Sequence, residues 1–112
     1  MKIKVDAYGK IIETTDINRA NRISSDYSHL VVFANKKDIE KALKDNIEIQ
    51  TPAWAMGSGF HHWNITENGK VSCFGWGNGW QDQKTSYHSL RDAIDYIWKH
   101  RKNAKVSNYP KL

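Results

Sequence analysis

The chain has very little cysteine. Cys73 is the single one among 112 residues, so no disulfide can form within the chain. A lone cysteine is typical of a protein kept in a reducing compartment. The first residues also lack the apolar core of a secretory signal peptide, and we therefore expect a cytoplasmic location. No apolar run approaches the roughly 20 residues of a membrane helix, so we expect no membrane partner.

Motifs of metal and cofactor sites are missing as well. No Cys-x-x-Cys or His-x-x-x-His spacing occurs in the chain. The Gly-Ser-Gly run at 57–59 has no lysine of the kind that a phosphate-binding P-loop carries. His61 and His62 are adjacent, and neighbouring residues of a strand point to opposite faces, so they do not suit one ion. We expect no metal and no cofactor.

Catalysis by Cys73 is the least favoured function. His62 or His88 would have to act as its base, with Asn64 orienting the imidazole. No catalytic signature surrounds the cysteine, and lone cysteines more often pack as small apolar side chains. The chain is therefore predicted not to be an enzyme.

Positive charge is confined to one end of the chain. Residues 1–83 carry ten Lys or Arg and ten Asp or Glu, whereas residues 84–112 carry seven basic and two acidic residues. The whole net charge of +5 therefore lies in the last quarter. A local basic surface suits a polyanion or an acidic protein partner, although a solvated helix end would look the same. The candidate contacts are Arg91, Lys99, Arg101, Lys102 and Lys105.

Tryptophan and glycine are concentrated between residues 51 and 80. This segment holds four of the five tryptophans and six of the seven glycines. Glycine-rich loops can present indole rings to a planar ligand, and an aromatic side chain stacked on a base contributes about 1–3 kcal/mol. We expect Trp63 and Trp98 in the core, because each lies on a face that periodicity assigns. The candidate ligand-binding residues are Trp54, Trp76, Asn78, Trp80 and Gln81.

Alternation and capping residues predict the elements of the first half. A strand is expected at 1–8, followed by a turn at Tyr8-Gly9-Lys10 and a returning strand. Residues 14–26 show no clear period and form a loop or a short helix. The apolar run 29–34 predicts a central strand buried on both faces. A helix follows it, capped by Asn35 and ended at Asn46, and then a short strand at 47–50 closed by Pro52.

Asn68-Gly69 predicts a hairpin with a two-residue type I′ turn. In that register Glu67 pairs with Lys70, Trp63 faces Phe74, and His61 faces Trp76. Trp63 and Phe74 would then lie together on an aromatic face that packs against a helix.

The last helix is predicted from Ser89, an N-cap with Asp92 three residues later, and from the apolar stripe of Leu90, Ala93, Ile94, Ile97 and Trp98. Residues 103–112 are expected to be a loosely ordered tail. The fold predicted for residues 1–112 is one small α+β domain, with a mostly antiparallel sheet of four to six strands and two helices packed on it.

The sequence is compatible with three functions. The leading one is a small non-enzymatic binding protein that uses the Trp/Gly loops and the basic C-terminal helix for a nucleic acid or a nucleotide. The alternative is a protein-binding inhibitor or adaptor with an acidic partner, and a phage or mobile-element accessory protein is compatible with this. The Cys/His enzyme comes third. The oligomeric state is open.

Overall fold

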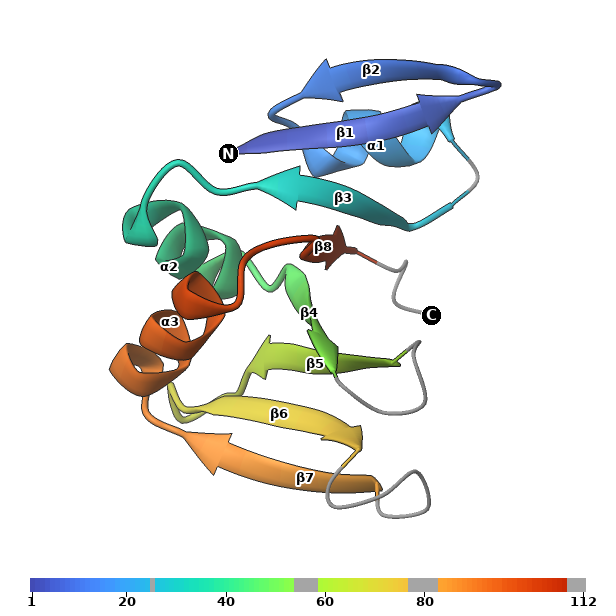
Figure 1. The fold of residues 1–112 in the computed structure, drawn as a ribbon. Helices are drawn as coiled ribbons and strands as arrows, with labels where there is room; N and C mark the ends of the chain where they lie inside the picture. Colours follow the sequence, from blue (N-terminus) through green and yellow to red (C-terminus); the bar gives the residue numbers. More distant parts are fainter. Residues whose placement is uncertain (25, 54–58, 77–82, 109–112) are drawn as a thin grey trace.

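The computed structural model describes residues 1–24, 26–53, 59–76 and 83–108. They form an α+β fold with a single sheet, and the helices pack on one face of that sheet (Figure 1). The eight strands are β1 (Lys2–Ala7), β2 (Lys10–Thr14), β3 (Ser28–Val32), β4 (Glu48–Ala53), β5 (Gly59–Ile65), β6 (Val71–Trp76), β7 (Gln83–His88) and β8 (Lys105–Ser107). The three helices are α1 (Ile17–Ile23), α2 (Lys36–Lys44) and α3 (Leu90–Lys99).

All eight strands join in one antiparallel sheet, in the order β2-β1-β3-β8-β4-β5-β6-β7. The α+β class and the antiparallel sheet are confirmed. The expected four to six strands and two helices were too few. β7 (Q-K-T-S-Y-H) and β8 were missed because polar or very short strands carry little periodic signal. Across the described ranges, no helix combines the length and apolar character needed to cross a bilayer.

Local sequence rules explain the N-terminal elements. Ile3 and Val5 alternate with exposed residues and are fully buried, and Tyr8 and Gly9 form the two-residue turn with positive φ angles of 55° and 89°. The polar stretch after β2 contains α1, because the Asp16 side chain caps its first turn by accepting a hydrogen bond from Asn18 N. The short-helix alternative for residues 14–26 is therefore the one observed.

α2 and α3 begin at the predicted caps. Asn35 accepts from Asp38 N at 3.0 Å, and Ser89 accepts from Asp92 N at 3.1 Å. Asn46 ends α2 with a φ of 60°, where its N–H and that of Ile47 satisfy the last carbonyls of the helix. The two helices lie side by side (Figure 1), and their apolar stripes join one core with the sheet.

Residues 29–32 of the run 29–34 belong to the interior strand β3, which is not buried on both faces. His29 and Val31 of β3 face the core, whereas Leu30 and Val32 are 44% and 50% exposed. The prediction was wrong because it assumed helices on both sides of this strand, as in a parallel sheet. The described helices cover only one face.

The hairpin between β5 and β6 has a different turn from the predicted one. Thr66 N donates to Lys70 O at 2.7 Å and Gly69 N donates to Thr66 O at 3.0 Å, with Gly69 at a φ of 81°. This is a three-residue loop, a type I turn followed by a left-handed glycine. One extra loop residue moves every later side chain to the other face. Trp63 therefore faces Cys73, and His62 faces Phe74.

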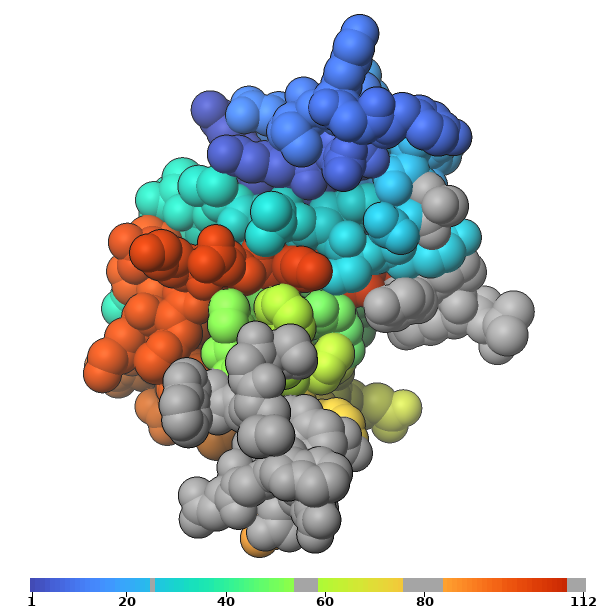
Figure 2. All heavy atoms as spheres, turned by 45° about the vertical axis from the view of Figure 1, so that its right-hand side comes forward, coloured from blue at the N-terminus to red at the C-terminus, as the bar shows by residue number. Residues whose placement is uncertain are grey.

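Residues 103–108 are not a loose tail. β8 lies between β3 and β4 in the middle of the sheet, and Ala104 and Val106 are fully buried. Figure 2 shows the corresponding band of red atoms between those of the N-terminal half and those of β4 and β5. The prediction was wrong because β8 has only three residues, too few to show an alternating pattern in the sequence. The strand is held by its pairing with β3 and β4 on either side. Residues 109–112 lie outside the described residues.

Candidate functional site

In the described part of the chain, one face of the sheet carries no helix, and this face is called the open face below. Its central row crosses all eight strands by direct cross-strand pairing, and neighbours in such a row point to the same side of the sheet. The row is Glu13, Lys4, Leu30, Lys105, Gln50, His62, Phe74 and Thr85. Ile3, Val31, Val106, Ile49 and Trp63 point to the opposite side, where they form the core with the helices.

Aromatic side chains gather on one half of the open face. Phe60 and His62 of β5, Phe74 of β6 and Tyr87 of β7 form what we call the aromatic strip. Phe74 is 42% and Tyr87 is 65% exposed. The rings of His62 and Phe74 have centroids 6.5 Å apart. Phe60, Phe74 and Tyr87 thus follow a diagonal that spans about 10 Å across three neighbouring strands, with Tyr87 four residues further along the strand direction than Phe60.

Lys105 brings a positive charge to this strip. It lies on β8 opposite Gln50, and its side chain reaches over β4, so that Nζ is 5.0 Å from the centroid of the Phe60 ring. A lysine over a ring face is attracted by the ring's electron density. It is the one predicted cation that the structure places beside aromatic side chains of the open face.

Glu48 is the centre of a hydrogen-bond network that holds His62 of the aromatic strip and two neighbouring side chains, Gln50 and Asn64. Glu48 Oε2 accepts from Gln50 Nε2 at 2.8 Å and lies 3.2 Å from His62 Nδ1, and Oε1 accepts from Asn64 Nδ2 at 2.9 Å. Burial raises the pKa of the Glu48 carboxyl, but the hydrogen bonds from His62, Asn64 and Gln50 outweigh it and leave the pKa below its ordinary value. The carboxylate therefore stays ionised and fixes the orientation of the side chains that surround it.

The other predicted cations lie away from this strip. Arg91 is in the first turn of α3 and Lys99 in the last, about 12 Å apart along the helix. Arg101 Cζ lies 3.8 Å from the centroid of the Trp98 ring, and its Nη1 donates to Trp98 O at 2.8 Å. Lys102 is exposed beyond the helix. The five cations therefore do not make one patch.

Most of the predicted ligand-binding residues lie outside the described residues: Trp54, Asn78, Trp80 and Gln81. Trp76 ends β6, and its side chain is also outside what the structure describes. The strand ends that bound the two glycine-rich connections can be placed. Ala53 pairs with Gly59, and Trp76 pairs with Gln83, at the end of the sheet where Phe60 lies.

The Cys73 side chain is buried in the fold. It is 8% exposed, on the core side beside Trp63, whereas His62 points to the open face. Burial raises the pKa of the thiol to about 11, against a smaller opposing effect of a hydrogen bond with Ser86. The predicted two-residue turn would have put His62 on the same face as Cys73, and the observed register separates them. His88, the other predicted base, lies on the side of Cys73, with its Nε2 2.7 Å from Ser86 Oγ. Among the described residues, no group of three or more potential metal ligands occurs.

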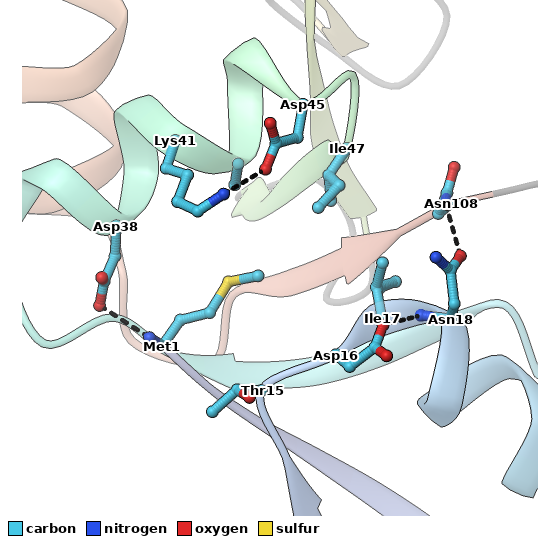
Figure 3. A pocket seen from close by; sticks show the side chains of 11 residues that line it. Met1, Thr15, Asp16, Ile17, Asn18, Asp38, Lys41, Asp45, Ile47 and Asn108 are labelled. Carbon is cyan, nitrogen blue, oxygen red and sulfur yellow. Dashed lines mark hydrogen bonds and ion pairs between the residues drawn. The ribbon is translucent and has the colours of Figure 1, made fainter.

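The molecule also has a hollow of about 640 Å³ between α2, the start of α1 and the end of β8 (Figure 3). Four of its charged groups form two ion pairs, and the fifth, Asp16, caps α1. The Met1 amine lies 3.0 Å from Asp38, and Lys41 lies 2.8 Å from Asp45. The hollow is on the helix side, away from the open face, and its paired charges give no indication of a ligand.

Phe60, Phe74, Tyr87 and Glu48 are the residues that sequence reasoning missed as site candidates. Phe74 was assigned to the core by the wrong hairpin register. The available signal was Thr66, whose hydroxyl lies 2.6 Å from Asn68 Oδ1 and 2.8 Å from Lys70 O and closes the longer loop by donating to one of them. Trp63 was assigned correctly and is 2% exposed, whereas Trp98 is only partly buried.

Comparison of the chain with protein-family models, with curated proteins and with solved structures finds no match.

Proposed function

We propose that this chain is a non-enzymatic binding protein whose open face binds single-stranded nucleic acid. The observation that carries the proposal is the aromatic strip, in which the exposed rings of Phe74 and Tyr87 continue to the half-buried Phe60, where Lys105 adds a positive charge. Unpaired bases stack on such rings with little dependence on sequence, and a cation next to them neutralises the backbone. Core packing does not account for the exposure of Phe74 and Tyr87.

The dimensions favour an oligonucleotide over a mononucleotide. Phe74 and Tyr87 lie on neighbouring strands with Phe60 one strand further along, so the strip spans about 10 Å across the sheet. That width accommodates more than one base. His62 and Asn64 are held by Glu48 and can hydrogen-bond to base edges.

In this proposal the Trp/Gly segment extends the same site. The strand ends that bound both glycine-rich connections lie at the Phe60 end of the strip. Trp54, Trp76 and Trp80 would add stacking there, with Asn78 and Gln81 as hydrogen-bonding groups. Arg91, Lys99, Arg101 and Lys102 would supply only longer-range attraction, because α3 packs on the other face.

The test is a titration of a fluorescently labelled single strand of about 20 nucleotides, at several salt concentrations. Phe74→Ala and Tyr87→Ala should each weaken binding by about 1–3 kcal/mol without changing the salt slope. Lys105→Gln should reduce that slope by about one. Tyr8→Ala is the matched control, since Tyr8 is a fully exposed tyrosine at the β1–β2 turn.

Two results would remove the proposal. One is an absence of binding even at low salt. The other is a loss of affinity for Tyr8→Ala as large as that for Tyr87→Ala. That result would show that the nucleic acid contacts any exposed tyrosine and has no specific site on the aromatic strip. Competition by a mononucleotide at the affinity of the oligonucleotide would replace the polymer with a small nucleotide as the ligand.

A further inference from the structure

The other half of the open face carries an exposed aliphatic ridge. Leu30 and Val32 of β3 are 44% and 50% exposed. Their spacing of two residues puts both side chains on the same face of the strand. β3 is an interior strand that pairs with β1 and β8, so this apolar surface is not the fringe of an edge strand. Neighbouring aliphatic side chains exposed on a sheet are typical of an interaction surface.

Lysines border the ridge on both sides. Lys2 pairs directly with Val32, Lys4 pairs with Leu30 from the β1 side, and Lys105 pairs with Leu30 from the β8 side. None of the three has a carboxylate within ion-pair distance in the described part of the chain. The nearest acidic positions on this face are Glu13, opposite Lys4, Asp6 further along β1, and Glu48, which is diagonal to Lys105 and bonded to Gln50, His62 and Asn64.

We propose that this ridge docks an acidic amphipathic helix of a partner protein. The backbones of Lys4 and Lys105 stand one strand to either side of Leu30, about 10 Å apart, which matches the diameter of an α-helix. The Lys105 side chain, which lies over Phe60, would turn toward β3 to meet the helix. A helix lying along β3 would set its apolar stripe on Leu30 and Val32. Carboxylates on its two flanks would meet the lysines, in the manner of an amphipathic helix in a groove.

The aliphatic character of the ridge favours a protein over a polyanion. Leu30 and Val32 have no ring for a base to stack on, and a nucleic acid would use only the lysines. A helix with apolar and acidic stripes uses both. The docking site is independent of the proposed nucleic-acid function, since the ridge lies on β3 and the aromatic strip on β5 to β7. Lys105 is the one residue that borders both.

The experiment is fluorescence polarisation with a labelled synthetic helix. The peptide carries leucines at i, i+3, i+4 and i+7, with glutamates on both flanks. A peptide of the same composition in scrambled order is the ligand control. Leu30→Ser/Val32→Ser should weaken binding of the ordered peptide by about tenfold or more, and Lys2→Gln/Lys4→Gln should weaken it and flatten its salt dependence.

Ile11→Ser and Lys10→Gln are the matched protein controls. They remove an exposed aliphatic side chain and a lysine from β2, away from the ridge, and should leave the affinity unchanged. The proposal is overturned if the ordered peptide does not bind, if the scrambled peptide binds equally well, or if the Leu30/Val32 variant keeps full affinity. Circular dichroism of each variant separates loss of the surface from loss of the fold. Loss of single-strand binding with peptide binding intact would reject the nucleic-acid proposal alone.

Discussion

His29 is a titratable side chain enclosed by the fold. It is 4% exposed on the core side of β3, and its Nε2 lies 2.9 Å from Asn21 Oδ1. Burial lowers the pKa of His29 below its ordinary value of 6.5, although the Asp26 carboxylate acts in the opposite direction. In the unfolded chain the imidazole regains that ordinary value, so the unfolded state binds the proton more readily.

The resulting prediction concerns stability against pH. The free energy of unfolding should be unaffected by His29 well above pH 6.5 and should fall as the pH decreases below it. Urea denaturation at about pH 7.5 and about pH 5.5 measures this before most carboxylates titrate. His29→Gln should be less sensitive over that interval. Equal pH dependence in wild type and variant would assign the effect to other groups.

Two glycines of the Trp/Gly-rich segment have structural explanations of their own. Gly69 has a φ of 81° in the hairpin loop. Gly75 lies in β6, where an added Cβ would collide with the ring of His61. The glycine content that pointed to a ligand-binding loop is thus partly a requirement of the hairpin. The local sequence around Gly75 could not have predicted this requirement, because the contact with His61 depends on the pairing of β5 with β6.

At the scale of elements, the β5–β6 loop decides which side chains reach the open face. Gly69→Ala should lower the free energy of unfolding by about 1 kcal/mol, because an alanine is strained in the left-handed region. Gly69→Asn should cost less, since asparagine tolerates that region. Chemical denaturation of the two variants measures the difference. Equal stability of Gly69→Ala and wild type would contradict the described loop.

The elements that sequence predicted well are those specified locally. The caps Asn35 and Ser89 and the apolar stripes of α2 and α3 lie within a few residues of one another. The turn at Tyr8-Gly9 is equally local. The faces of β3 and β6 could not be obtained in the same way. The face of β3 depends on which side of the sheet the helices cover, and the face of β6 depends on one residue of the β5–β6 loop. Because the loop was predicted one residue too short, Phe74 was assigned to the core and left out of the candidate site.

At the scale of the whole molecule, β8 joins two halves of the sheet. β2, β1 and β3 lie on one side of it, and β4 to β7 lie on the other. Val106 is fully buried in this strand and pairs with His29 on one side and Ile49 on the other. No direct pairing of β3 with β4 occurs in the described sheet. The hydrogen-bonded continuity of the sheet therefore passes through three residues, while the shared core couples the two halves on the helix side.

Val106→Asp should unfold both halves together. It introduces a buried charge without a partner, a change that commonly costs several kcal/mol. Hydrogen exchange should show amides of β1 and β6 losing protection at the same rate. Lys105→Gln is the matched control, because the adjacent side chain points to the open face. If β6 kept its protection while β1 lost it, the halves would be independent folding units.

The position of β8 also bears on how the protein is made. A ribosome has to deliver residues 105–107 before β3 and β4 can be joined, long after both strands have been synthesised. Until then the nascent chain carries two partial sheets, each ending in an unpaired interior strand. Bare strand edges of this kind recruit other chains. Messages truncated shortly before this strand should therefore yield products that aggregate or require chaperones, even though nearly all of the core residues are present.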